Sequence, residues 1–328
     1  MKVFIASYAD EEARGVASRL SNLYKLSDHT HEIADDPEVA DIILVAGLGN
    51  DLEEHSYIEA AVYNEVINAH SDQCFTISYR DQPVIFNRGI YESGQRSGVR
   101  GLLSVGRVRG GTYGISGSFN AHVKAHQAGA DSEEKEYLLS FIGRASSSAR
   151  RRLFSMAFTR KDIYIEDSSV FSLWNCAETG DLERWRQRYY ETLVRSKFSL
   201  CPRGSGTGSI RLFESMKCGV APIIVSDGWI PPGGVRWEDF SLTVSEGNLD
   251  QLEEIAAAHE SRHREMGFLA RQAYEKCFQE EVYFNYLVEQ CAAMKRAQVI
   301  PESVYWALRI PIALWLTARS GKAVFGNG

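Results

Sequence analysis

The stretch SKFSLCPRGSGTGSIRLFESMKCGVAPIIVSD, residues 196–227, decides the fold of this chain. It predicts a buried strand over 197–201, then a glycine-rich loop, a helix over 209–219 and a second strand over 220–226. A helix that joins two strands in this way makes them parallel strands of one sheet. The stretch is therefore typical of an α/β domain with a doubly wound sheet.

Strands and helices alternate over much of the remaining sequence. Strand-like runs occur at 2–6, 40–46, 74–79, 136–144 and 162–167, and helical periodicity occurs at 10–24, 58–70 and 182–196. The glycines between 89 and 117 predict turns and short extended pieces, and the chain after 248 is mainly helical. We expect two α/β domains at 1–130 and 131–300, and a C-terminal helix and tail at 301–328 that packs back on the first domain.

The composition is that of a globular protein. The 328 residues are 44% hydrophobic and 24% charged, and 36 Lys and Arg against 43 Asp and Glu give a net charge of −7. These values exclude a largely disordered chain and argue against nucleic-acid wrapping, although a local basic site is allowed. The six cysteines form no C-x-x-C pair, which predicts a reducing, cytoplasmic setting without disulfides or a zinc site.

Neither end of the sequence predicts a membrane span. The start, MKVFIASYADEEARG at 1–15, does not contain the long apolar region of a secretory signal. The apolar segment VYWALRIPIALWLTA at 304–318 is short for a span and is broken by Arg309 and Pro311. We therefore expect a cytoplasmic protein whose segment 304–318 forms a packed or interfacial helix, able to contact the inner face of a membrane peripherally.

The loop between the two strands of the opening stretch carries three glycines, Gly204, Gly206 and Gly208. The backbone N–H groups of such a loop can approach an anion, and the start of the following helix adds the positive end of its dipole. The spacing fits neither a Walker A loop nor G-x-G-x-x-G, and no glycine-rich fingerprint follows the first strand, which disfavours a dehydrogenase. Two interpretations remain, a diphosphate cradle and a plain tight connection.

Arg211 and Glu214 lie three residues apart, so they share one face of the helix that follows this loop. An arginine can pair with phosphate oxygens, and a carboxylate can accept both hydroxyls of a ribose. The alternative is an i,i+3 surface salt bridge, which contributes little to stability. Beside the glycines, the two side chains favour a nucleoside diphosphate site.

The opening stretch resembles the signature of the exostosin-type glycosyltransferases, in which a SKFCL.P.G strand, an R..EA...G helix and a C.PVI.SD strand follow one another. Here the corresponding runs are SKFSLCPRG, RLFESMKCG and VAPIIVSD. Weaker similarity extends back to FIGR at 141–144 and forward to 237–252. The resemblance implies a GT-B fold with two Rossmann-like domains facing a cleft, the first on the acceptor side and the second binding a nucleotide-sugar donor.

The resemblance also implies a reaction. An inverting glycosyltransferase of polysaccharide biosynthesis moves a sugar from a nucleotide-sugar donor, a UDP-sugar in the first instance, to a glycan or glycoconjugate acceptor. No cofactor is expected, and metal independence agrees with the absence of an Asp-x-Asp triplet from the sequence. The alternative is a noncatalytic partner subunit that keeps the donor cradle, and donor hydrolysis or transfer separates the two.

Carried over residue by residue, the resemblance assigns Glu214 to the donor ribose and Arg211 to the diphosphate that leaves. Further donor-binding candidates stand in the glycine-rich loop and at strand ends: Arg144, Arg203, Gly204, Ser205, Gly206, Ser209 and Asp227. For Asp227, a turn-forming role is the alternative. Of the three adjacent arginines at 150–152, not all can face the donor.

An inverting transfer needs a general base that accepts the proton of the acceptor hydroxyl, and the first domain is expected to supply it. The segment SYRDQPVIFNRGIYES at 78–93 resembles the family's y.D.p....pG.Y segment, which favours Asp81. The alternatives are Asp51, Glu53, Glu54, Glu92 and His122. The donor sugar, the acceptor and the oligomeric state stay open.

Overall fold

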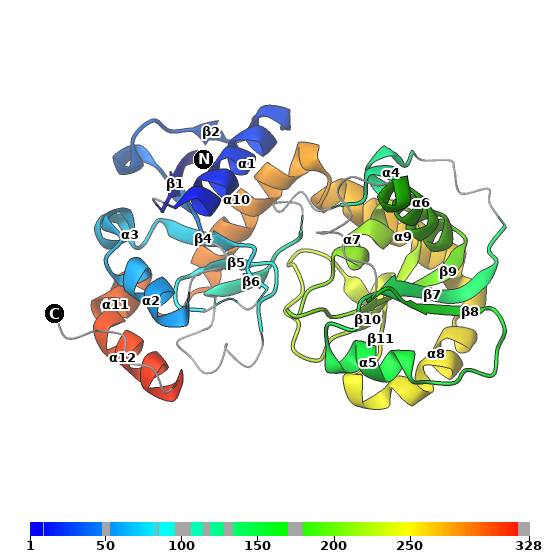
Figure 1. The fold of residues 1–328 in the computed structure, drawn as a ribbon. Coiled ribbons are helices and arrows are strands. Elements are labelled where there is room, and N and C mark those ends of the chain that lie inside the picture. Colours follow the sequence, from blue (N-terminus) through cyan, green and yellow to red (C-terminus); the bar gives the residue numbers. More distant parts are fainter. Residues whose placement is uncertain are drawn as a thin grey trace. The chain divides into compact units, whose positions relative to one another are not determined.

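The computed structural model describes residues 1–8, 10–47, 53–81, 83, 85–95, 106–113, 119–127, 134–169 and 180–320. The chain forms two compact units, each with its own parallel sheet (Figure 1). The first unit comprises Met1–Ser116, Gly228–Gly234 and Glu280–Gly328, and the second comprises Gly117–Asp227 and Val235–Gln279. The units divide at 116 where the sequence suggested 130, and the chain returns to the first unit at Glu280 where the sequence suggested 301.

The first unit contains a parallel sheet with the strand order β2-β1-β3-β4-β5-β6. The strands are β1 (Lys2–Ser7), β2 (Glu32–Ile33), β3 (Ile42–Ala46), β4 (Cys74–Ser78), β5 (Gly89–Tyr91) and β6 (Val108–Gly110). Every residue of β3 and β4 is buried, as expected for central strands of a parallel sheet that is covered on both faces. The expected strands at 2–6, 40–46 and 74–79 are thus confirmed.

Helices from both ends of the chain pack in the first unit. They are α1 (Glu11–Leu26), η1 (Pro37–Val39), α2 (Glu54–Val62), α3 (Glu65–His70), α10 (Glu280–Ala297), α11 (Glu302–Ala307) and α12 (Arg309–Ser320). The Asp10 side chain caps α1 by accepting a hydrogen bond from the backbone N–H of Ala13, 2.9 Å away. Helix α1 contacts α10, and α12 contacts α2 (Figure 1). The segment from Glu280 onward is therefore built into this unit.

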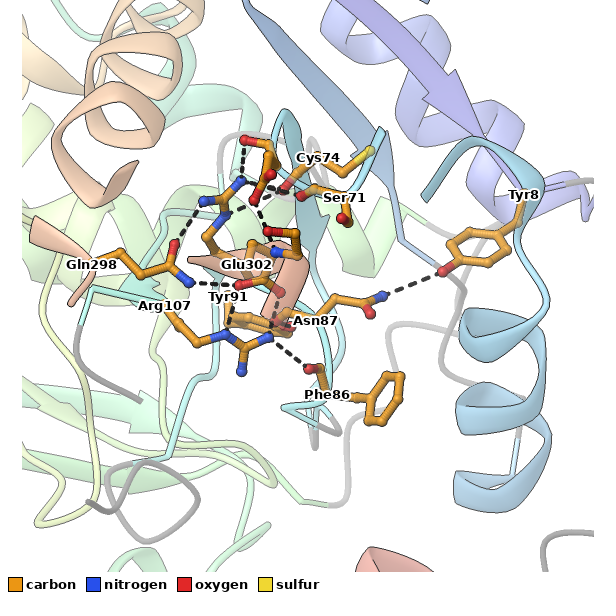
Figure 2. A network of polar contacts seen from close by, with 12 residues as sticks. Tyr8, Ser71, Cys74, Phe86, Asn87, Tyr91, Arg107, Gln298 and Glu302 are labelled. Carbon is orange, nitrogen blue, oxygen red and sulfur yellow. Dashed lines mark hydrogen bonds and ion pairs between the residues drawn. The ribbon is translucent and has the colours of Figure 1, made fainter. Parts of the chain in front are cut away.

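A buried network of charges holds this returning segment to the strands (Figure 2). The Arg107 guanidinium donates two hydrogen bonds to the Glu302 carboxylate, from Nε to Oε2 at 2.8 Å and from Nη2 to Oε1 at 2.7 Å. Gln298 donates to Glu302 at 2.7 Å and accepts from Arg88, also at 2.7 Å. Arg88 precedes β5 and Arg107 precedes β6, so the ends of α10 and α11 are tied to both short strands.

The second unit contains a five-stranded parallel sheet with the order β11-β10-β9-β7-β8. Its strands are β7 (Tyr137–Gly143), β8 (Ile163–Asp167), β9 (Ser196–Pro202), β10 (Ala221–Val225) and β11 (Leu242–Thr243). Its helices are α4 (Ala121–Ala125), α5 (Ser148–Phe154), α6 (Gly180–Val194), α7 (Ile210–Lys217), η5 (Trp237–Asp239), η6 (Glu246–Gln251), α8 (Leu252–Ala258), η7 (Glu260–Arg262) and α9 (His263–Cys277). With a parallel sheet and helices in each unit, the α/β, GT-B prediction of two Rossmann-like domains is confirmed.

The opening stretch of sequence folds as expected into β9, α7 and β10. Gly219 ends α7 with a φ of 65°, a left-handed conformation that glycine adopts without steric cost. A Cβ atom on Gly267 of α9 would lie 2.1 Å from the Gly219 oxygen, so only glycine allows α9 to approach the end of α7 this closely. Strands β9 and β10 pair from Phe198 to Pro202, which places the glycine-rich loop and the start of α7 at one edge of the sheet.

Among the residues that the structure describes, no helix is long and apolar enough to cross a membrane. The apolar segment at 304–318 forms most of α11 and α12. Part of it joins the hydrophobic core of the first unit. The packed helix expected there is therefore present.

Candidate functional site

The strands β7, β8, β9 and β10 are parallel, and the segments that follow them leave the same carboxyl edge of the second sheet. The carboxyl ends of parallel strands share one edge, and ligands of open α/β sheets bind there. Most of the residues expected to bind the donor stand in these loops: Arg144, Arg203, Gly204, Ser205, Gly206, Ser209 and Asp227. The fold thus brings them to one edge of the second unit, whereas Asp81 belongs to the first unit.

A cavity of about 440 Å³ lies at this edge, between the loops that follow β7 and β8 and the helices α5 and α6. The polar and aromatic side chains in its walls are Arg144, Ser146, Arg150, Ser168, Ser169 and Trp185. The Trp185 indole stacks on the Tyr189 ring, with 5.6 Å between centroids. Two guanidinium groups, three hydroxyls and an aromatic face offer contacts to a ligand that carries phosphate and a flat ring system.

The sequence did not single out Trp185 or the serines of this cavity. Ser168 and Ser169 directly follow the strand expected at 162–167, so their position at a strand end was the available signal. Trp185 lies inside the helix expected at 182–196, and nothing local indicates which side of that helix meets a cavity. Its position at the cavity emerges only from the packing of α6 beside β7.

Arg150 is held at the cavity by the backbone that follows β9. Its Nε donates to the Arg203 oxygen at 2.9 Å, and its Nη2 donates to the Pro202 oxygen at 3.0 Å. A Cβ atom on Gly204 would lie 3.6 Å from that Nη2, so the guanidinium lies against the glycine-rich loop. Of the three adjacent arginines, Arg150 is the one that lines the cavity.

The other two arginines of α5 do not line the cavity, although Arg151 donates a hydrogen bond to the oxygen of Ala145, a cavity residue, at 3.3 Å. Arg152 donates to the backbone oxygens of Glu246 and Gly247, at 3.1 and 2.9 Å, and pairs with Asp250 at 3.1 Å. Arg151 is exposed. Neighbouring residues on a helix point in different directions, which explains why one arginine reaches the cavity and the others do not.

Arg203 and Asp227, which were both expected to bind the donor, form hydrogen bonds with Glu246 at the start of η6. The Arg203 Nε lies 2.7 Å from the Glu246 Oε1, and the Asp227 Oδ1 accepts a hydrogen bond from the Glu246 backbone N–H at 3.0 Å. Neither side chain is among those that line the cavity. Both order the start of η6, a role that the sequence did not indicate, and their contact with a donor stays a prediction.

The glycine-rich loop leads into the start of α7 as expected. Gly206 and Ser209 are buried, and Ser205 is exposed. Ser209 occupies the N-cap position of α7, and its side chain makes no capping hydrogen bond to that helix. The positive end of the helix dipole is therefore directed to the loop, as an anion site requires.

Arg211 is buried in the second unit, with 8% of its surface exposed. Its guanidinium lies between the rings of Phe141 and Tyr189, 4.7 and 4.4 Å from their centroids, and donates a hydrogen bond to the Ile142 oxygen. These contacts fasten α7 to β7 and α6. Burial excludes the surface salt bridge as an interpretation, and the catalytic contact of Arg211 with a leaving diphosphate stays a prediction.

Glu214 is buried more deeply, with 4% exposed. It accepts a hydrogen bond from the backbone N–H of Asn120 at 2.7 Å and another from the Tyr189 hydroxyl. Burial raises the pKa of Glu214 above its ordinary value, although both hydrogen bonds favour the charged form. Its two oxygens are thus used inside the protein, and the expected contact with a ribose stays a prediction.

Glu214→Gln is expected to change how stability depends on pH. Because burial raises the folded-state pKa of Glu214, the folded chain holds this proton more tightly than the unfolded chain, whose carboxyl has the ordinary value of 4.5. The contribution of Glu214 to the free energy of unfolding is fully present below pH 4.5 and is lost as the pH rises through the raised pKa. Glutamine stays neutral, so the Tm of the variant relative to the parent increases as the pH rises from 4.5.

Glu253→Gln is a control of opposite sign for that measurement. Hydrogen bonds from Thr159 lower the pKa of Glu253 below its ordinary value of 4.5. Its contribution to the free energy of unfolding is therefore present above pH 4.5 and is lost as the pH falls through the lowered pKa. The Tm of this variant relative to the parent therefore decreases as the pH rises. Melting curves from acidic to neutral pH measure both differences, and a Tm difference for Glu214→Gln that does not change with pH would contradict the raised pKa.

The carboxylates considered as general base lie in the first unit. Asp81 follows β4 and is half-buried, and Glu92 follows β5 and is 3% exposed. Both stand at the carboxyl edge of the first sheet. Glu53 is the exposed N-cap residue of α2. Asp51 and the side chain of Glu54 lie outside the described residues.

His122, the remaining alternative for the base, belongs to the second unit, where its Nε2 lies 2.8 Å from a carboxylate oxygen of Glu183. Within the described ranges, no group of three or more His, Cys, Asp and Glu side chains is placed to hold a metal ion. The cysteines that flank α7 are buried, and burial raises the pKa of Cys201 to about 11. Cys201 is therefore a protonated core residue at neutral pH.

Comparison with known proteins identifies a domain within the chain. Residues 115–259 match the exostosin GT47 domain. The chain is 29% identical over 157 residues to the exostosin-1 homolog of Caenorhabditis elegans, which covers 43% of this chain and 41% of that protein. It is 45% identical over 91 residues to the probable glucuronoxylan glucuronosyltransferase IRX7 of Arabidopsis thaliana, which covers 24% of this chain and 20% of that protein. These matches span less than half of either relative.

Solved structures align with a larger part of the chain. A crystal structure of an alpha1,3-fucosyltransferase covers 90% of both chains, with 14% identity and a TM-score of 0.45. A crystal structure of MurG from Acinetobacter baumannii covers 89% of this chain and 99% of that one, with 9% identity and a TM-score of 0.36.

Proposed function

We propose that this chain is an exostosin-like glycosyltransferase of polysaccharide biosynthesis, because its residues 115–259 match the exostosin GT47 domain. The observation that supports this most strongly is the cavity at the carboxyl edge of the second sheet. Its walls contain Arg144, Arg150 and Trp185, all within the matched residues. Cations and an aromatic face at that edge suit a nucleotide sugar.

The proposed donor is a nucleotide sugar, with a UDP-sugar as the first candidate. Its base stacks on Trp185, and its diphosphate pairs with Arg144 and Arg150 near the start of α7. Fixed cations favour the negative charge that develops on the diphosphate as the sugar leaves, so the reaction is proposed to need no metal ion or other cofactor. Glu214 and Arg211 hold α7 in place beside the site. Their direct contact with the donor ribose and diphosphate is a further part of the proposal.

The proposed transfer is a single displacement with inversion at the anomeric carbon. The acceptor hydroxyl oxygen forms a bond to the anomeric carbon while the bond between that carbon and the diphosphate oxygen breaks. A carboxylate accepts the proton of the hydroxyl group. We assign the carboxylate to Asp81, because its side chain is half-buried and accessible whereas Glu92 is 3% exposed. The acceptor is a glycan or glycoconjugate.

The test is transfer by the purified chain from a panel of UDP-, GDP- and TDP-sugars to oligosaccharide acceptors, with and without EDTA. The expected result is release of one nucleoside diphosphate, an elongated acceptor with inverted anomeric configuration, and rates that EDTA does not change. Donor binding without turnover would instead identify a noncatalytic partner subunit. A product with retained anomeric configuration would contradict the single-displacement mechanism.

Trp185→Ala is expected to weaken nucleoside diphosphate binding by about 5- to 150-fold, because stacking of a base on an aromatic side chain contributes ~1–3 kcal/mol. Trp185→Phe keeps an aromatic face and is expected to bind within a few-fold of the parent. Titration calorimetry with UDP measures both affinities, and melting curves check that the contact with Tyr189 is not needed for folding. Unchanged affinity in the alanine variant would place the base elsewhere.

A further inference from the structure

The aromatic part of the cavity wall has a buried layer beneath it, which is the ring of Tyr189. Trp185 lines the cavity, and Tyr189 follows it by four residues on α6. Residues four apart lie on the same side of a helix. The two rings stack with 5.6 Å between centroids and 27° between planes, and Tyr189 is 5% exposed. The indole at the cavity is therefore supported from inside the second unit by the Tyr189 ring.

Arg211 and Glu214 of α7 both contact Tyr189. The Arg211 guanidinium carbon lies 4.4 Å from the centroid of the Tyr189 ring, and the Glu214 carboxylate accepts a hydrogen bond from the Tyr189 hydroxyl. All three side chains are buried. Burial strengthens a cation–π contact and makes the loss of a hydrogen bond costly. The two residues of α7 that the sequence singled out therefore fix the ring and the hydroxyl of the same tyrosine.

The two side chains that hold Tyr189 are themselves fixed by other elements. Arg211 also lies over the Phe141 ring, 4.7 Å from its centroid, and donates a hydrogen bond to the backbone of β7. Glu214 also accepts a hydrogen bond from the backbone N–H of Asn120 at 2.7 Å. A close-packed side chain with fixed neighbours keeps a single rotamer. We therefore expect the Tyr189 ring to stay in one orientation and to give the stacked indole a fixed surface.

We propose that Tyr189 is a positioning residue of the donor site, because its ring holds the Trp185 indole in the orientation that receives the nucleotide base. This inference rests on the proposed function, in which the base stacks on Trp185. Tyr189 does not line the described cavity, so it acts through the indole and not on the ligand. When fewer chains hold the indole in the receiving orientation, the apparent affinity for the nucleotide falls in proportion.

A tyrosine that only fills the core of the second unit would behave differently. Loss of such a residue loosens the whole unit, so it weakens the binding of every ligand at the carboxyl edge of the sheet. Loss of a positioning residue weakens only a ligand that has a base, because the phosphate contacts proposed for Arg144 and Arg150 do not involve Trp185. Inorganic pyrophosphate, which has phosphates and no base, therefore separates the two roles. A positioning role also has an upper limit, since it cannot contribute more to binding than the indole does.

Titration calorimetry with UDP and with inorganic pyrophosphate tests the proposal on the full chain. Tyr189→Leu removes the stacked ring and is expected to weaken UDP binding by about 2- to 12-fold, the contribution of an aromatic pair, without changing the affinity for pyrophosphate. Tyr189→Phe keeps the ring but not the hydroxyl bond to Glu214, so its loss of UDP affinity is expected to be smaller. Tyr190→Leu is the matched control on α6 and is expected to bind UDP as the parent does, since the Tyr190 ring stacks on His122.

Two further measurements examine the step through Trp185 directly. In the double variant Tyr189→Leu/Trp185→Ala, UDP is expected to bind as weakly as to Trp185→Ala alone, because no indole remains to be positioned. Acrylamide quenching of the Trp185 emission needs no ligand, and it is obtained for each chain as the difference from the same chain with Trp185→Phe. This quenching is expected to increase in Tyr189→Leu and, to a smaller extent, in Tyr189→Phe, since an indole without its fixed neighbour is exposed more often.

The outcomes that overturn this proposal differ from those that overturn the proposed function. Equal losses of UDP and pyrophosphate affinity, additive losses in the double variant, or unchanged quenching of Trp185 would each leave Tyr189 as a core residue only. A parent chain that binds no nucleoside diphosphate contradicts the proposed donor site, and the positioning role with it. Melting curves show which variants are folded. If Tyr189→Leu does not fold, parent-like UDP affinity and quenching in Tyr189→Phe overturn the positioning role.

Discussion

Replacing Arg150 by glutamine is expected to lower the kcat for the nucleotide-sugar donor by about 10²- to 10³-fold, the loss typical when one fixed group that stabilises a developing anion is removed. The Arg150 guanidinium lines the cavity and is fixed by the Pro202 and Arg203 oxygens. In the proposed reaction it stabilises charge on the leaving diphosphate without reorganisation, because it is already in place. Initial rates of nucleoside diphosphate release at saturating donor measure the effect.

Arg152→Gln is the matched control for this prediction. Arg152 lies two residues further along α5 and bonds to η6 instead of lining the cavity, so its replacement is expected to leave the rate within a few-fold of the parent. Arg150→Lys keeps the charge and is expected to recover part of the lost activity. Melting curves separate the loss of the backbone contacts from the loss of charge. Parent-like rates for Arg150→Gln would mean that the donor diphosphate binds outside this cavity.

Features encoded in neighbouring residues could be predicted from the sequence. The apolar runs of β3, β4, β9 and β10 and the glycine that ends α7 are local patterns, and each appears where it was expected. Arg144 follows a predicted strand, so its position at the carboxyl edge could also be inferred, and it lines the cavity. The α/β class with two domains follows from such patterns, whereas the two Rossmann-like domains were implied by the family resemblance.

Features that depend on distant partners could not be predicted. Arg203 pairs with Glu246, 43 residues further on, and Glu214 accepts a hydrogen bond from Asn120, 94 residues earlier. Periodicity shows which residues share a helix face but not what packs against that face. For the same reason Trp185 was not selected, and Arg150 could not be separated from its neighbours. The segment after Glu280 is held in the first unit partly by the ion pair between Arg107 and Glu302, which lie 195 positions apart in the sequence.

That ion pair gives the largest expected loss of stability. Replacing Glu302 by glutamine leaves the Arg107 guanidinium buried without a counter-charge, since the two side chains are 5% and 4% exposed. Removing one partner of a buried ion pair typically costs about 3–5 kcal/mol, and we expect this loss in the free energy of unfolding of the first unit. Urea unfolding measures it, and faster hydrogen exchange in β5 and β6 locates it.

Two further variants decide whether the charge is the cause. Glu280→Gln breaks an exposed pair with Arg19 at 3.3 Å in the same unit, which is expected to cost less than about 1 kcal/mol. The double variant Arg107→Met/Glu302→Leu removes both buried charges and is expected to recover most of the lost stability, because the loss comes from an uncompensated charge. If the double variant is as unstable as Glu302→Gln, the hydrogen bonds of Gln298, and not the paired charges, hold α11 to the strands.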